Sequence, residues 1–147
     1  MDVTIRRAVP EDAHAVADVL IHSRAGAKDA IPPGIHPDHE VREWVRTVVI
    51  PARETWLALG PAPLAVLVLD DGWIDQLYVR PEATGQGIGS RLVDFAKDRR
   101  PAGLQLWTFQ SNTGAQRFYQ RHGFTVAETT DGSRNEEKSP DLRYIWP

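Results

Sequence analysis

A glycine-rich turn between a strand-like and a helix-like segment constrains the fold of this chain most. Gly85, Gly87 and Gly89 alternate after a run that ends at Val79 and has the pattern of a β-strand. Apolar residues follow at helical spacing, at Ile88, Leu92, Phe95 and Ala96. Backbone N–H groups at a helix start attract anions, and glycine lets a ligand approach the backbone. The turn therefore predicts a phosphate-binding site.

The other segments predict a mixed α/β sheet with helices on its faces. The expected strands are Val3–Val9, Thr55–Leu59, Leu64–Leu69, Trp73–Val79, Leu104–Phe109, Phe124–Thr130 and Leu142–Trp146. The expected helices run from Pro10 to about Arg24, from about Asp38 to shortly before Pro51, from the glycine-rich turn to beyond Ala96, and from Asn112 to near His122. Short turns among the middle strands indicate antiparallel pairing, whereas the unit 73–109 indicates a parallel pair.

Length and charge narrow the class of protein. A chain of 147 residues suits one domain, spanning 1–147. The net charge of −3 offers no basic field for nucleic acid, and no apolar run reaches the roughly 18 residues of a membrane span. The N-terminus lacks the apolar core of a signal peptide. Because the chain has no cysteine, thiolate metal sites and a cysteine nucleophile are excluded. We expect a cytoplasmic protein without metal that binds neither nucleic acid nor membranes.

Two common nucleotide-binding motifs do not match the glycine-rich turn. A dinucleotide fingerprint needs a glycine or alanine where Ser90 stands, and it begins a parallel unit, whereas the strands before Trp73 are expected to be antiparallel. A P-loop needs a lysine, which the turn lacks. A nucleotide-binding oxidoreductase is therefore disfavoured.

A second segment, from Asn112 to Phe124, narrows the choice of phosphate-bearing ligand. It reads N-x-x-A-x-x-F-Y-x-x-x-G-F, at Asn112, Ala115, Phe118, Tyr119, Gly123 and Phe124. The first segment reads L-x-V-x-P-x-x-x-G-x-G-x-G from Leu77. In this order the two segments resemble the GCN5-related N-acetyltransferase (GNAT) superfamily over about 64–130, and the element order agrees from Val3 to Trp146.

One position departs from that family. The family usually has arginine or glutamine three residues before the middle glycine, where this chain has Thr84. A side-chain contact to the pyrophosphate is then weaker, although the backbone cradle is kept. Arg80 or Arg91 either supplies a cation nearby or is a solvated surface residue.

The resemblance implies acetyl-CoA as co-substrate, held where strands 73–79 and 104–109 separate. Its pantetheine would pair with the backbone of Leu77 and Val79 as an added strand does. Its pyrophosphate would lie on the N–H groups of residues 86–90 at the helix start. The implied cofactor-binding residues are Leu77, Tyr78, Val79, Thr84, Gly85, Gln86, Gly87, Ile88, Gly89, Ser90 and Asn112.

The resemblance also implies direct attack of an amine on the thioester, with a backbone N–H near Leu77 stabilising the oxyanion. Tyr119 matches the family's general acid, which protonates the leaving thiolate. The alternative is a core aromatic residue beside Phe118. Adjacent helical residues point about 100° apart, so we expect that Phe118 and Tyr119 do not face the same core.

The amine must first lose a proton, because an alkyl amine with a pKa of about 10.4 is charged at neutral pH. Asp75 is the candidate base, expected by strand alternation to lie on the same face as Leu77. It could instead bind the substrate cation or pair with an arginine. His36, His39 and Glu40 are further options.

The acceptor is the least determined part of the site. The loop 131–141 carries more carboxylates than cations, which would suit a cationic amine or reflect only a solvated loop. Trp107 and Phe109 share one strand face and could wall the thioester end of the gap.

These observations predict an enzyme that transfers acetyl from acetyl-CoA to a primary amine on a small molecule or peptide. A non-catalytic acyl-CoA-binding sensor on the same fold is the alternative. By resemblance, a homodimer is possible. Neither the acceptor nor the general base follows from the residues alone.

Overall fold

The computed structural model describes residues 2–147. Its strands are β1 (Thr4–Arg7), β2 (Glu54–Leu59), β3 (Pro63–Asp70), β4 (Trp73–Val79), β5 (Leu104–Phe109), β6 (Thr125–Thr130) and β7 (Asp141–Trp146). Its helices are α1 (Ala13–Gly26), α2 (Asp38–Trp44), α3 (Ile50–Ala52), α4 (Ile88–Arg99) and α5 (Thr113–Arg121), with short turns η1 (Pro10–Asp12), η2 (Val45–Val49) and η3 (Pro81–Ala83). This order confirms the predicted mixed α/β fold.

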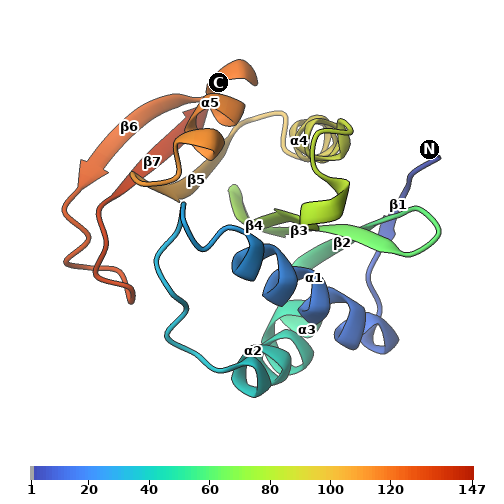
Figure 1. Ribbon diagram of the computed structural model, residues 1–147. Helices are drawn as coiled ribbons and strands as arrows, with labels where there is room; N and C mark the ends of the chain where they lie inside the picture. Colours follow the sequence, from blue (N-terminus) through green and yellow to red (C-terminus); the bar gives the residue numbers. More distant parts are fainter. Residues whose placement is uncertain (1) are drawn as a thin grey trace.

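The strands form one sheet in the order β1-β2-β3-β4-β5-β7-β6. Neighbours pair antiparallel except β4 and β5, which are parallel as predicted. These two strands share a single pair of ladder partners, Trp73 and Gln105. Beyond that pair they separate, so over its later residues the β5-facing backbone edge of β4 pairs with no strand of the described residues 2–147 (Figure 1).

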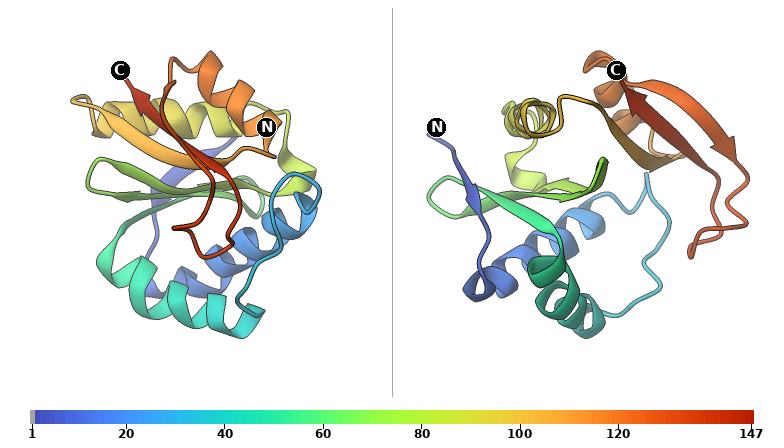
Figure 2. Two further views of the ribbon diagram at one scale, coloured as in Figure 1. Left: turned by 90° about the vertical axis from the view of Figure 1, so that its left-hand side faces the viewer. Right: turned by 180° about the vertical axis from the view of Figure 1, so that it is seen from behind.

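Helices cover both faces of the sheet (Figures 1 and 2). On one face, α1 and α2 pack over a cluster that includes Val16, Leu20 and Leu57. On the other face, α4 and α5 pack over a cluster that includes Leu67 and Leu92. Because both faces are covered, β3 is an almost uninterrupted apolar strand.

The second helix is longer than predicted. After α2 it widens into the π-turn η2, where the Ile50 N–H donates to the Val45 carbonyl. The chain then continues as α3, which contains Pro51. The prediction that Pro51 follows the end of this helix is therefore wrong. Proline lacks an N–H and clashes with the carbonyl four residues earlier, and a widened turn displaces that carbonyl.

A β-bulge in β4 overturns the predicted face of Asp75. Gln76 pairs with Val68 and Ile74 pairs with Leu69, which leaves Asp75 as an extra residue. The bulge reverses the alternation, so Ile74 and Leu77 both pack towards α4 and α5. Asp75 therefore does not share a face with Leu77. Within residues 2–147, no helix has the length and apolar character of a membrane span.

Candidate active site

The glycine-rich turn forms an open cradle at the start of α4. Gly85 and Gly87 have φ angles of 77° and 80°, a left-handed conformation that favours glycine. A Cβ atom added to either would meet no atom of the described part of the chain within 4 Å. The space beside these two glycines is thus free for a ligand, as a phosphate-binding turn requires.

Gly89 serves packing instead. A Cβ atom there would lie 3.3 Å from the Phe118 ring, so this glycine allows α5 to pack closely against α4. Ile88 is buried in the core, which leaves only its backbone to face a ligand. Ser90 shares a hydrogen bond of 3.0 Å with Nε2 of His122. The pKa of His122 is lowered, chiefly by burial.

The side chains that could add a contact to the cradle make other contacts. The Thr84 hydroxyl donates to the Pro81 carbonyl at 2.8 Å, while Gln86 is exposed. Arg80 donates to the Pro63 carbonyl at 2.9 Å and contacts His22. Arg91 donates to the Val3 carbonyl at 2.8 Å. In this structure the cradle is therefore chiefly a backbone feature.

The backbone of β4 borders the gap between the separated strands. Leu77 and Val79 direct their side chains towards the α4 face, whereas Tyr78 packs towards α1 and α2. The Val79 carbonyl accepts a hydrogen bond of 3.0 Å from Ser23 of α1. Ser23 was not predicted as a site residue, because a small polar residue on the buried side of a helix is its only signal in the sequence.

Tyr119 lies at the core of the α4 face. It is 8% exposed, and its ring contacts those of Phe118 at 5.1 Å and Phe124 at 5.5 Å. Both Phe118 and Tyr119 thus face one core, contrary to the prediction, because α5 lies in the corner between the sheet and α4. Burial, with a smaller contribution from Tyr78, raises the pKa of Tyr119 far above its ordinary value. The phenol is therefore a neutral proton donor at physiological pH.

Asn112 is confirmed as the N-cap of α5. Its Oδ1 accepts a hydrogen bond of 3.1 Å from the backbone N–H of Ala115. At the other end of the helix, Gly123 has a φ angle of 85°, as expected for the residue that stops a helix. Asn112 therefore fixes the start of the helix that carries Tyr119.

Asp75 forms an ion pair on the α2 side of the sheet. Its carboxylate accepts a hydrogen bond of 2.6 Å from Nη1 of Arg53. The Arg53 guanidinium in turn lies 5.4 Å from the centre of the Trp44 ring. Pairing with an arginine, one of the alternatives considered for Asp75, is therefore confirmed. The role of Asp75 as the general base stays a prediction.

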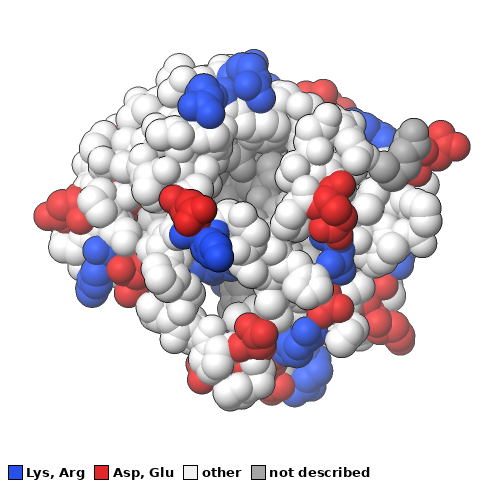
Figure 3. Space-filling view, viewed as in Figure 1, with Lys and Arg blue, Asp and Glu red and all other residues white. Residues whose placement is uncertain are grey.

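A large cavity opens beside β4 on the face that α1 and α2 cover. It has a volume of about 940 Å³ and reaches Gln76 of β4. Figure 3, in the view of Figure 1, shows a separate hollow above the centre of the molecule, between α5 and α4, with charges of both signs around it. The ionisable groups lining the cavity are Arg24, Lys28, His36, Asp38, Glu40, Glu43, Glu136 and Glu137. Most of the other lining residues are apolar, from α1, the segment 27–37 and α2.

The segment 27–37 and the β6–β7 loop meet at this cavity (Figure 2). His36 lies 3.0 Å from Glu40 of α2 and 3.2 Å from Glu136 of the β6–β7 loop. These hydrogen bonds, first with Glu40 and then with Glu136, raise the pKa of His36. Ser111 of the β5–α5 turn donates to the Ala30 carbonyl at 2.6 Å. His39 is exposed and does not line the cavity.

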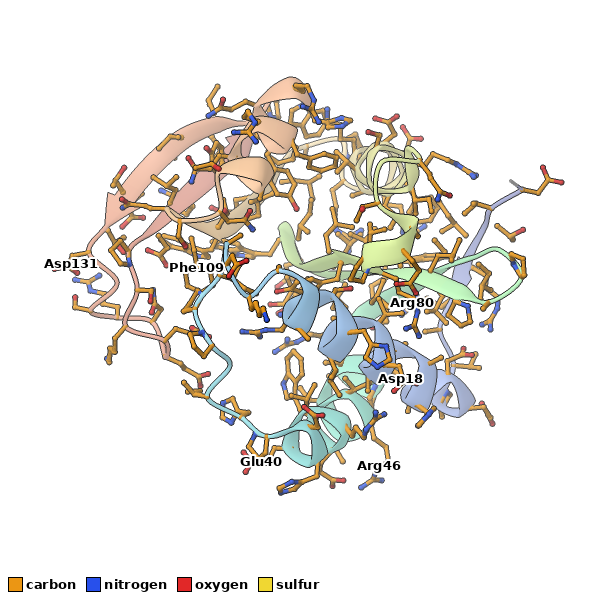
Figure 4. The ribbon with its side chains drawn as sticks, viewed as in Figure 1. Asp18, Glu40, Arg46, Arg80, Phe109 and Asp131 are labelled. Atoms are coloured by element: carbon orange, nitrogen blue, oxygen red, sulfur yellow. The ribbon has the colours of Figure 1, made fainter. Side chains whose placement is uncertain are left out.

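A second cavity, of about 500 Å³, lies under the β6–β7 loop. Trp107 and Phe109 both line it, and the alternating burial along β5, in which Leu106 and Thr108 are buried and Trp107 and Phe109 are not, agrees with their sharing one face. Figure 4 shows Phe109 beside the segment 27–37. The two cavities thus border β4 and β5 at the place where these strands separate.

Comparison with known proteins places this geometry in a family. Residues 51–126 match the family model described as an acetyltransferase (GNAT) domain. The chain is 31% identical over 100 residues to a peptidyl-lysine N-acetyltransferase, YjaB, of Salmonella typhimurium, covering 67% of this chain and 68% of the relative. It is 26% identical over 120 residues to the peptidyl-lysine N-acetyltransferase YiaC of Escherichia coli, covering 76% and 80%.

Solved structures share the fold. The solution structure of apo-form YjaB from Escherichia coli superposes with a TM-score of 0.80 at 24% identity, covering 99% of this chain and 98% of that one. The PaiA N-acetyltransferase of Thermoplasma acidophilum, in complex with coenzyme A, superposes with a TM-score of 0.72 at 21% identity, covering 99% and 98%.

Proposed function

This chain belongs to the GNAT family of acetyltransferases, and from that premise we propose that it transfers the acetyl group of acetyl-CoA to a lysine-type primary amine. One observation carries the proposal. A phosphate-binding cradle follows β4, and a cavity rich in carboxylates reaches the same strand at Gln76, where β4 and β5 have separated. Such an arrangement brings a thioester and an amine together between the two strands.

The residues of the gap would hold the co-substrate mostly through backbone groups. The N–H groups of residues 86–90, at the start of α4, would hold a pyrophosphate in the open space beside Gly85 and Gly87. The free edge of β4 at Leu77 and Val79 would pair with pantetheine amides. A backbone N–H near Leu77 would stabilise the oxyanion, a contact worth about 3 kcal/mol in comparable sites.

Tyr119 would act as the general acid. The neutral amine attacks the thioester carbonyl carbon, a C–N bond forms and the C–S bond breaks. The phenol gives its proton to the leaving sulfur and regains one from the nitrogen, so that the products are the acetamide and the free thiol of CoA. A tyrosine phenol is protonated at neutral pH, and the raised pKa of Tyr119 keeps it so, which means that the group carries the proton that this step needs.

The chemistry of the large cavity supports a lysine-type acceptor. Five carboxylates line it against the two cations Arg24 and Lys28, which favours a positively charged ligand. Its apolar walls, including Ile31 and Trp44, suit an aliphatic stem. Two relatives named as peptidyl-lysine N-acetyltransferases agree with this class of acceptor.

Asp75 remains the proposed base, and a pH profile tests it. If Asp75 takes the proton of the acceptor, Asp75→Asn will lower kcat/KM by about 100-fold and remove its acidic limb. An acidic limb that matches the wild type would exclude this role and leave Asp75 as the ion-pair partner of Arg53. The melting temperature of the variant must be measured alongside, because the substitution weakens that pair.

A panel of amines tests the proposed function. We expect CoA release to depend on both the protein and a blocked lysine-containing peptide or a small alkyl amine, with the acetyl group found on the amine by mass spectrometry. An aromatic amine, neutral at pH 7, should be a poorer acceptor. Strong binding of acetyl-CoA without transfer to any primary amine would contradict the proposal and favour a sensor.

A further inference from the structure

The β6–β7 loop (131–140) is held in one conformation by internal hydrogen bonds and is not simply a solvated hairpin. Asp141 is 8% exposed and accepts hydrogen bonds from the Thr130 hydroxyl and from Asn135 Nδ2. Asn135 also donates to the Ser139 carbonyl at 2.7 Å and accepts from the Ser139 N–H at 3.1 Å. Gly132 has a φ angle of 83°, and a Cβ there would collide with the Ser139 backbone. These contacts fix the path of the loop.

This loop holds Glu137 at the junction of the two cavities. Among the residues that the structure describes, Glu137 alone lines both the cavity that reaches β4 and the cavity that reaches β5. Its side chain is 17% exposed, whereas that of Glu136 is 65% exposed. Glu137 is therefore the acidic side chain of the loop that faces the place where the two strands separate.

The electrostatic surroundings of Tyr78 agree with this position. Burial raises the pKa of Tyr78, Arg24 opposes the rise, and the Glu137 and Asp75 carboxylates add to it. Tyr78 in turn contributes to the raised pKa of Tyr119. The Glu137 carboxylate thus lies within electrostatic reach of a tyrosine that is itself within reach of the proposed general acid.

Three of the other carboxylates that line the larger cavity have closer ion-pair partners than Glu137 has. Glu136 and Glu40 both contact His36, at 3.2 and 3.0 Å. Glu43 contacts Arg46 at 2.7 Å. Among residues 2–147, the ion pair of Glu137 is a loose one, with its Oε2 3.9 Å from Nη2 of Arg24. A weak ion pair in a half-buried place is readily replaced by a better donor, such as an alkylammonium group.

We propose that Glu137 determines acceptor specificity by receiving the ammonium group of the amine at the mouth of the β4–β5 gap, in exchange for Arg24. Asn135 and Asp141 act as positioning residues, because they fix the loop that carries Glu137. The inference rests on the proposed function and deepens it: the acceptor is an amine that arrives as a cation, with its aliphatic stem along the larger cavity.

Substitution of Glu137 tests this proposal. A blocked lysine-containing peptide is the probe, and the KM for peptide, the KM for acetyl-CoA and the affinity for peptide without acetyl-CoA are measured. Glu137→Gln should raise the peptide KM and weaken peptide binding by about tenfold or more, which is the effect of losing one hydrogen bond to a charged group. The KM for acetyl-CoA should not change. Glu137→Asp, which keeps the charge, should restore part of the loss.

Asp131→Asn is the matched control. It removes a carboxylate from the same loop, but Asp131 lies at the outer edge of the molecule, bonded to the Ser133 N–H at 2.9 Å (Figure 4). We expect wild-type constants for this variant. A Glu137→Gln protein with wild-type peptide KM and affinity would overturn the inference while the proposed function stands, and so would an equal loss in Asp131→Asn. A wild-type protein that acetylates no lysyl peptide or alkyl amine would overturn both.

Discussion

Replacing Tyr119 by phenylalanine is expected to lower kcat by about 100-fold or more, the usual contribution of a general acid. The substitution removes the only group of this side chain that can donate a proton. It keeps the ring, and with it the edge-on contacts to Phe118 and Phe124. Steady-state kinetics and titration with acetyl-CoA measure the effect.

Tyr144→Phe is the control for this variant. Tyr144 is a buried tyrosine of the same cluster, and its ring lies 6.5 Å from that of Tyr119. Its hydroxyl accepts a hydrogen bond of 3.2 Å from Gln120, on the outer side of α5. We expect Tyr144→Phe to change stability slightly and kcat by less than about threefold. The acid role would be contradicted by a Tyr119→Phe protein with wild-type turnover, or by a loss of turnover explained by weaker acetyl-CoA binding.

Replacing Gly87 by aspartate is expected to weaken acetyl-CoA binding by about 100-fold or more. The φ angle of 80° is unfavourable for any residue with a Cβ, at a cost of about 1–2 kcal/mol. The new side chain would also occupy the open space of the cradle and repel a pyrophosphate. Isothermal titration gives the dissociation constant, and thermal melting shows whether the fold is kept.

Two further variants separate the causes of that loss. Gly87→Ala adds the strain without the charge, so its effect on acetyl-CoA affinity should be clearly smaller. Gly72→Ala is the control, because Gly72 lies in the β3–β4 turn and its nearest neighbour to an added Cβ is 3.9 Å away. Wild-type affinity in Gly87→Asp would mean that the pyrophosphate is bound elsewhere.

The sequence predicted the fold well wherever local pattern and topology agree. The amphipathic spacing of Leu92, Phe95 and Ala96 predicted α4, and Asn112 predicted the start of α5. The parallel relation of β4 and β5 followed from the helix between them. These features depend on neighbours in the sequence, which a single chain displays directly.

The errors have a common physical cause, which is pairing between distant segments. The bulge at Asp75 exists because β4 pairs with β3 in a shifted register, and strand alternation within β4 does not reveal it. The shared core of Phe118 and Tyr119 depends on where α4 packs against α5. A helical wheel assumes that a helix buries one face. Helix α5 buries two neighbouring faces, because it packs against both the sheet and α4.

The acceptor side of the site was the least predictable part for the same reason. Glu137 and Arg24 are far apart in the sequence and come together only because the β6–β7 loop folds back over α1. Gly132, Asn135 and Asp141 are residue types that are common in turns, so the sequence does indicate an ordered loop here. Their mutual hydrogen bonds, however, required coordinates.

Direct transfer between the two ligands in the β4–β5 gap is the central claim, and rapid-quench single-turnover kinetics with labelled acetyl-CoA and a lysine-containing peptide tests it most directly. The label should pass from CoA to the peptide amine in one kinetic phase, with none bound covalently to the protein at any time, and acetyl-CoA without peptide should remain intact. A labelled protein that forms and decays before the acetylated peptide appears, or bound acetyl-CoA that never yields an acetylated amine, would contradict the claim.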